Sequence, residues 1–141
     1  MPPALIESLG LHHVALRVQD VASVARFYRE LLGLKEIARF VRTDHSLRSI
    51  WLSAAAHSEP GAAFLAIEDA GPETKGRFGG VGMVAFNISV EARRNLPKAL
   101  EVRGLKMEHE TRWTSYLRDP EGNLVGLSHH PRDIDSASVH P

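Results

Sequence analysis

Histidines at the ends of strand-like segments are the residues of this sequence with the clearest capacity for chemistry. His12 and His13 begin the segment "HHVALRV", and His129 and His130 end the segment "NLVGLSHH". Imidazoles combined with carboxylates suit Fe, Mn, Ni or Zn. The chain has no cysteine, which excludes disulfides, thiolate metal sites and cysteine nucleophiles. A metal site would therefore need other parts of the chain to bring carboxylates to these histidines.

The elements that must position these side chains follow a repeating order. The first segment alternates apolar and polar residues and is rich in β-branched ones, which predicts a half-buried strand. A helix over 21–32 follows, with Asp20 as its N-cap and Gly33 as its C-terminal stop. Polar or Gly/Pro breaks then separate three more strand candidates, at 35–43, 47–55 and 62–69.

The second half of the chain repeats this order. Strands are expected at 82–90, 105–113 and 114–130, and Pro97 predicts a short helix that starts near Asn95. When the two halves of the sequence are aligned, His13 corresponds to Met83, 70 residues later, and Lys35 corresponds to Lys106, 71 residues later. We therefore predict an α+β protein of paired βαβββ modules. Their bounds are about 10–68 and about 81–130, with a linker at 69–80 and a loose tail at 131–141.

Composition narrows the function classes. With 141 residues, the chain suits one domain. Seventeen basic and seventeen acidic residues cancel, so there is no electrostatic argument for a nucleic acid or an anionic membrane as partner. We found no signal-peptide pattern and no apolar stretch of the roughly 18 residues that a membrane helix needs. We expect a cytoplasmic protein with a small organic molecule as its partner.

Two motifs carry a resemblance to a known family. The segment "LHHVALRVQDVASVARFYRELLGL" and the hairpin "YLRDPEGNLVGL" resemble the vicinal oxygen chelate superfamily, whose hairpin reads "DPDGN". This superfamily contains glyoxalase I, fosfomycin-resistance enzymes, extradiol dioxygenases and bleomycin-binding proteins. The resemblance covers about residues 10–130. It implies curved half-barrel sheets around a cavity, helices outside, and a homodimer.

Metal-dependent members of this superfamily hold a divalent ion with His and Glu side chains from both modules. His13 matches the first ligand position, but Met83 stands where the second module would supply a His. The Glu expected three residues after Asn123 is Gly126, and the remaining position falls on Leu65 or Ala66. One position of four is filled, so we expect no metal cofactor.

Neighbouring residues could replace the missing ligands, which keeps a metal-dependent alternative open. Glu68 lies two or three residues beyond the fourth position, roughly 7 to 10 Å along a strand. His130 lies four residues beyond Gly126, roughly 13 Å away by the same rise. His57, in a loop-like stretch, is a further candidate. If a metal binds, His13 is its first ligand and Glu68 a possible second.

The same positions can be interpreted as a ligand cavity. Arg17 shares a face with His13 and would suit an anionic or carbonyl-bearing ligand, or it lies in water at the rim of the sheet. A thioether and a bare backbone at two ligand positions would make the cavity larger and more apolar. Alternation places His12 on the face opposite His13, and His129 and His130 are expected to be solvated. The candidate ligand-binding residues are His13, Arg17, Trp51, Met83, Asn87, Tyr116 and Gly126.

Two classes of function follow. The first is a small-molecule protein with a degenerate metal site, which binds an apolar or aromatic organic ligand for sequestration or for metal-independent chemistry. The second is a metal-dependent lyase, isomerase or ring-cleaving dioxygenase that uses His13 with non-standard partners. Sequence does not decide whether the chain is an enzyme.

Overall fold

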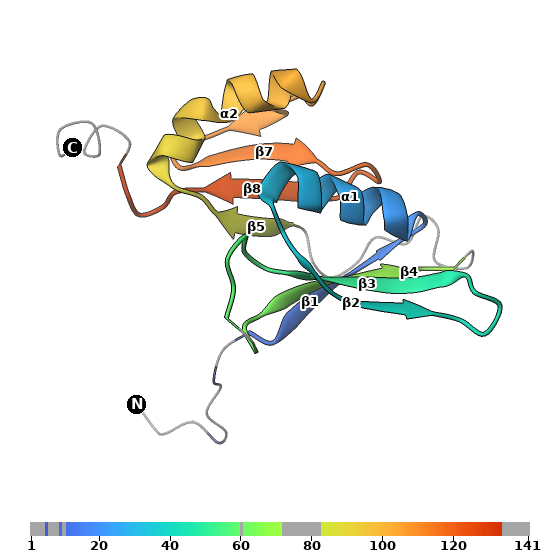
Figure 1. Cartoon of the computed structure of the whole chain (residues 1–141). Coiled ribbons are helices and arrows are strands. Elements are labelled where there is room, and N and C mark those ends of the chain that lie inside the picture. Colours follow the sequence, from blue (N-terminus) through green and yellow to red (C-terminus); the bar gives the residue numbers. More distant parts are fainter. Residues whose placement is uncertain (1–4, 6–8, 10, 60, 72–82, 134–141) are drawn as a thin grey trace. The chain divides into compact units, whose positions relative to one another are not determined.

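The fold is α+β and contains two copies of one supersecondary unit, as predicted. The computed structural model describes residues 5, 9, 11–59, 61–71 and 83–133. The chain divides into two compact units, Met1–Lys75 and Gly76–Pro141. Each unit holds one four-stranded sheet and one helix, which we call module one and module two (Figure 1). The predicted linker residues from 72 onward and the tail beyond 133 lie outside the described residues.

Module one has the strand order β1-β4-β3-β2, in which β1 and β4 are parallel and the other neighbours antiparallel. Its helix α1 begins as predicted, since the Asp20 carboxylate accepts a hydrogen bond from the Ser23 amide at 3.0 Å. The helix ends at Gly33, whose left-handed φ of 72° lets the chain turn away. The elements are β1 (His13–Val18), α1 (Val21–Leu32), β2 (Glu36–Val41), β3 (Leu47–Ser53) and β4 (Phe64–Asp69).

Module two repeats the order as β5-β8-β7-β6, with β5 and β8 parallel. Its last two strands, β7 and β8, join through the predicted turn. There the Asp119 carboxylate accepts hydrogen bonds from the amides of Glu121 and Asn123. The second strand of the module, β6, has two residues and is shorter than the predicted 105–113. The elements are β5 (Val84–Asn87), α2 (Val90–Val102), β6 (His109–Glu110), β7 (Thr114–Arg118) and β8 (Leu124–Ser128).

The predicted start of the second helix near Asn95 was wrong. Helix α2 begins at Val90, because the Ser89 hydroxyl caps it by accepting a hydrogen bond from the Ala92 amide at 3.0 Å. Pro97 lies inside the helix on its exposed side, where it lacks a backbone donor for the carbonyl of Arg93 and its ring crowds that carbonyl. The buried face of Val90, Leu96 and Leu100 and the N-cap outweigh that loss.

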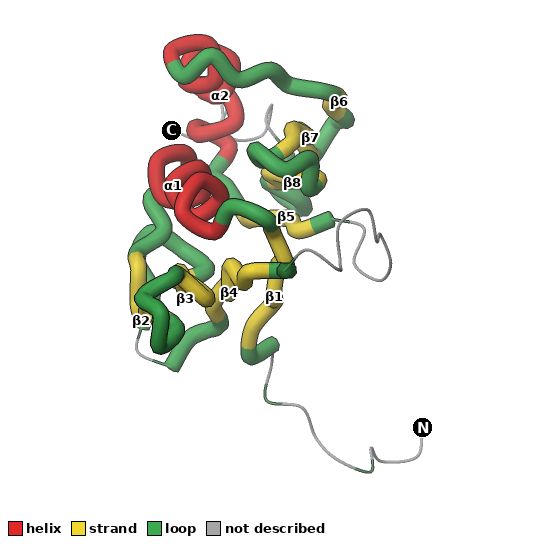
Figure 2. The backbone as a smooth tube through the Cα atoms, turned by 90° about the vertical axis from the view of Figure 1, so that its right-hand side faces the viewer, coloured by secondary structure: helices red, strands yellow, loops and turns green. Residues whose placement is uncertain are grey.

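Each sheet buries one face. In module one, helix α1 contacts β3 and β4, and Figure 2 shows it on one side of its sheet. Buried Tyr28 on the helix belongs to the same core as Leu52 and Ile67 on the strands. In module two, Arg93 on α2 donates to the Glu110 carboxylate and the Thr111 carbonyl, which ties the helix to β6. Among the described residues, no helix is long and apolar enough to cross a membrane.

Candidate functional site

The open face of module one carries the residues with chemical potential. Along β1 the side chains of His13 and Arg17 are exposed, whereas those of Leu16 and Val18 are buried toward the core. His13 and Arg17 therefore share one face, as predicted. Parallel pairing sets His13 opposite Phe64 and Arg17 opposite Glu68 on β4. This face presents an aromatic end and a charged end.

The aromatic end is a row of four rings, one from each strand of the sheet. We call Phe40, Trp51, Phe64 and His13 the aromatic row. Trp51 stacks on Phe64 with ring centroids 4.5 Å apart, and Phe64 stacks on His13 at 4.8 Å with the planes only 5° apart. Phe40 packs against Trp51 at 4.8 Å. None of the four rings is fully buried, so they form an apolar patch at the surface rather than a core.

The sequence-based candidates included two members of this row, His13 and Trp51, and did not include Phe40 or Phe64. The signal was present, because alternation in "EIARFV" places Phe40 on the same face as Ala38, which pairs with Trp51. The Arg48 guanidinium lies over the Phe40 ring, 5.6 Å from its centroid, at one end of the row. Arg17 and Glu68 supply further charge along the same face.

The prediction that His12 lies on the face opposite His13 was wrong. His12 precedes β1, so strand alternation does not apply to it. Its Nδ1 atom lies 2.9 Å from the Nδ1 atom of His13, and its ring meets Phe64 edge-on. One of the two imidazoles donates this hydrogen bond and the other accepts it.

Strand register settles which residue of β4 lies on the aromatic face. Leu65 is buried toward the helix, whereas Ala66 pairs with Ala15 on one side and Trp51 on the other. Of the two candidates for the fourth ligand position, Ala66 is therefore the one that shares a face with His13. Glu68 is on this face too, but it pairs with Arg17. It lies four residues beyond Phe64, the partner of His13, which is roughly 13 Å along the strand.

Module two places Met83 and Gly126 in contact. A Cβ atom added to Gly126 would lie 3.1 Å from the Met83 sulfur and 3.3 Å from the Ala85 Cβ atom. The Met83 thioether, 40 % exposed, thus occupies the space beside the bare glycine backbone. Tyr116 pairs with Gly126 as Trp51 pairs with Ala66, so these two aromatic residues hold equivalent positions in the two modules.

The other candidates of module two, Asn87 and Tyr116, each contact a neighbouring side chain. The Asn87 amide oxygen accepts a hydrogen bond from the Arg132 guanidinium at 2.7 Å. Tyr116 stacks on His109 of β6 at 5.8 Å. Beside this pair, two hydrogen bonds from Arg118 hold the pKa of the Glu108 carboxyl below its ordinary value. This ion pair fixes the short strand β6 next to Tyr116.

Solvation was wrongly predicted for His129. Its side chain is only 1 % exposed, and its Nδ1 atom lies 2.6 Å from the Arg132 carbonyl oxygen, to which it donates. The Trp113 ring packs edge-on against it. His130 is exposed, in agreement with the prediction.

The residues at the four ligand positions do not fit a divalent ion of the kind that the resemblance implies. Only His13 can donate, and its ring is engaged by His12 and stacked against Phe64. Alanine and glycine offer no side-chain donor, and the soft sulfur of Met83 is a poor ligand for Mn, Fe, Ni or Zn. Across the described parts of the chain, no three His, Asp or Glu side chains gather closely enough to hold a metal.

Comparison with known proteins identifies the family and includes a curated relative. A family model for the Glyoxalase/Bleomycin resistance protein/Dioxygenase superfamily matches residues 10–127. MhqE of Bacillus subtilis (strain 168), a candidate ring-cleaving dioxygenase by its name, is 30% identical over 104 residues. The match covers 72% of this chain but 34% of that protein, so the chain spans about a third of this relative.

Solved structures with the same fold include a lyase and a resistance protein. Lactoylglutathione lyase from Agrobacterium tumefaciens aligns with a TM-score of 0.60 and 21% identity, over 86% of this chain and 93% of that one. The fosfomycin resistance protein FosX from Listeria monocytogenes aligns with a TM-score of 0.68 and 18% identity, over 87% and 94%. At these identities the likeness establishes the fold.

Proposed function

Because the chain belongs to the glyoxalase/bleomycin resistance protein/dioxygenase superfamily, we propose that it is a small-molecule protein of this family with a degenerate metal site. It binds an apolar or aromatic organic ligand, either to sequester it or for chemistry that needs no metal. The observation that carries this proposal is the aromatic row on the open face of module one.

The aromatic row is suited to an apolar or aromatic ligand. Neighbouring rings already contact each other at 4.5 to 4.8 Å, so the surface is ordered before a ligand arrives and little side-chain entropy is lost on binding. A stacked aromatic pair adds about 0.5–1.5 kcal/mol beyond the burial of its apolar area. Arg48 at one end and Arg17 with Glu68 along the face can orient polar substituents.

Two features favour the metal-dependent alternative, a lyase, isomerase or ring-cleaving dioxygenase. The chain is 30% identical to a candidate ring-cleaving dioxygenase over the matched region, and the superfamily includes FosX, which has been crystallised with Mn(II). His13 would then act with non-standard partners such as Glu68, His57 or His130. The strand register weighs against Glu68, since it pairs with Arg17.

A ligand titration separates the two candidates. We expect 8-anilinonaphthalene-1-sulfonate, a fused-ring probe, to bind metal-stripped native protein with a saturable rise in fluorescence. Trp51→Ala should weaken its Kd at least about tenfold, because the central ring of the row is lost. The matched control is Tyr116→Ala, which removes the equivalent ring of module two and should change the Kd less than about twofold.

Circular dichroism of each variant excludes partial unfolding as the source of probe binding. Equal effects of the two substitutions would contradict the assignment to the aromatic row. Turnover of a catechol that is lost on chelation and on His13→Ala would establish the metal-dependent alternative instead. The predicted homodimer stays a prediction, which light scattering can test against the 15.6 kDa chain mass.

A further inference from the structure

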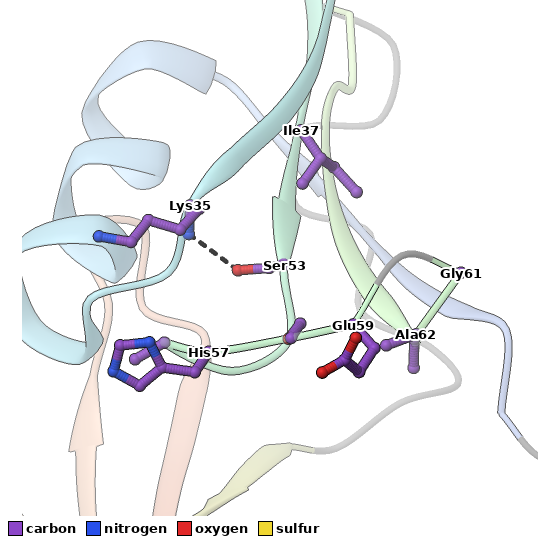
Figure 3. A pocket seen from close by; sticks show the side chains of 10 residues that line it. Lys35, Ile37, Ser53, His57, Glu59, Gly61 and Ala62 are labelled. Carbon is purple, nitrogen blue, oxygen red and sulfur yellow. Dashed lines mark hydrogen bonds between the residues drawn. The ribbon is translucent and has the colours of Figure 1, made fainter.

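A hollow of about 550 Å³ lies in module one, outside the aromatic row. It is formed where β2 begins, where β3 ends and along residues 54–59 and 61–63 (Figure 3). None of the four rings of the row lines it. Its volume falls in the range of about 300–1,000 Å³ that is usual for small-molecule sites.

The walls of this hollow are held by hydrogen bonds. The Ser53 hydroxyl, 5 % exposed, accepts from the Lys35 amide at 2.8 Å and donates to the Ala55 carbonyl at 2.7 Å. The loop closes where the Ala54 amide donates to the Ala63 carbonyl. A β-bulge between Glu36 and Ala38 leaves Ile37 without a cross-strand partner and 53 % exposed at the hollow.

Three polar side chains line the hollow without partners among the described residues. The Lys35 ammonium, the His57 ring and the Glu59 carboxylate make no hydrogen bond or ion pair within that part of the chain. In Figure 3, Lys35 and His57 lie on one side and Glu59 lies on the other, together with Ala62. A single exposed charge needs no ligand, but opposite charges on two sides of a hollow that also has apolar lining residues favour a ligand of matching pattern.

From this arrangement we propose a second ligand site for a small zwitterion with an apolar body, such as an apolar α-amino acid. The carboxylate of the ligand lies toward Lys35 and His57, and its ammonium group lies toward Glu59. The apolar body packs on Ile37 and Ala62. The site does not depend on the ligand proposed for the aromatic row.

The test is an NMR titration of the intact protein with L-leucine. We expect saturable shifts of the backbone amides of residues 54–59 and 61–63 and of Ile37. Lys35→Met and Glu59→Gln should each weaken the Kd about three- to fivefold, the size expected for a partly exposed ion pair. The matched control is Lys106→Met, which changes the repeat-equivalent lysine in module two and should leave the Kd unchanged.

Leucine analogues assign each charge. 4-Methylpentanoate lacks the ammonium group, so its binding should respond to Lys35→Met and not to Glu59→Gln. 3-Methylbutylamine lacks the carboxylate and should show the reverse. Trp51→Ala should not change the leucine titration, which separates this site from the aromatic row. Non-saturable shifts, or equal effects of Lys35→Met and Lys106→Met, would overturn the proposal.

Discussion

Module one and module two share a strand order and a register but present different open faces. The open face of module one carries stacked rings that end at His13. The corresponding face of module two carries Met83 against Gly126 and a hydrogen bond between the Thr114 and Ser128 hydroxyls. Module one therefore carries a row of four contacting rings, whereas module two carries a thioether beside a bare glycine backbone and one stacked pair, Tyr116 with His109.

The difference shows which positions the fold constrains. On the helix-covered face, Ile67 of β4 and Leu127 of β8 hold equivalent places and are both buried. On the open face, Trp51 and Tyr116 also hold equivalent places, but their neighbours differ. A buried apolar face fixes the register of a strand, because a shift of one residue would expose it. The open face has no such constraint, so it can carry different chemistry in each module.

The largest loss of stability is expected for substitutions at the buried positions that the two modules share. Ile67→Ala and Leu127→Ala should each lower the free energy of unfolding by about 2–5 kcal/mol, through lost burial and a new cavity. Urea denaturation followed by circular dichroism measures the change. Val102→Ala is the control, since this side chain is exposed and should change stability by less than about 0.5 kcal/mol.

If either core variant lowers the free energy of unfolding by less than about 1 kcal/mol, that position is not part of a rigid core. This result would contradict the view that the two modules share equivalent buried positions. Trp51 and Trp113 lie in different modules, so their fluorescence in single-tryptophan variants reports each module separately. Coincident transitions would show that the modules unfold together.

A smaller change in stability is expected at Gly126, where the open faces of the two modules differ. Gly126→Ala places a Cβ atom 3.1 Å from the Met83 sulfur, while it also removes the backbone freedom of a glycine within a strand. We expect a change within about 1 kcal/mol in the native background and a clear stabilisation in the Met83→Ala background. The coupling between the two substitutions should reach at least about 0.5 kcal/mol.

Additive effects of Gly126→Ala and Met83→Ala would contradict the contact between these residues. The matched substitution in module one is Ala66→Gly, which should cost about 0.5–1 kcal/mol because it adds freedom to the unfolded chain. A double-mutant cycle by urea denaturation measures all of these values.

Sequence was sufficient for the parts of the fold that local patterns control. Alternation located the strands, and Asp20 with Gly33 located both ends of the first helix. The Asp-Pro-Glu-Gly-Asn turn appeared as predicted. The start of the second helix was missed because Pro97 was given more weight than the capping hydroxyl of Ser89.

Contacts between distant segments could not be predicted in the same way. The choice between Leu65 and Ala66 needed the register between β1, β4 and β3, which no local pattern specifies. The burial of His129 depends on Trp113 and on the turn to Arg132. The aromatic row required four strands to be in register, so sequence indicated only His13 and Trp51, as separate residues.

The smallest expected effect concerns pH and two exposed ion pairs, one in each module. Arg118 lowers the pKa of Glu108 through two hydrogen bonds, and Arg39 lowers the pKa of Glu36 in the same way. A lowered pKa in the folded state means that the pair contributes stability above the ordinary pKa of 4.5. That contribution disappears as the pH falls through the lowered pKa.

Arg118→Met and Arg39→Met should therefore differ from the native chain in stability at neutral pH and converge with it in acid. Carboxyl NMR titration should show the pKa of Glu108 rising toward 4.5 in Arg118→Met, while that of Glu36 does not move. Arg39→Met should give the reverse pattern. A Glu108 pKa that stays low without Arg118 would show that another group of module two stabilises the carboxylate. The two ion pairs would then differ in origin, and the modules would differ in electrostatics as well as in their open faces.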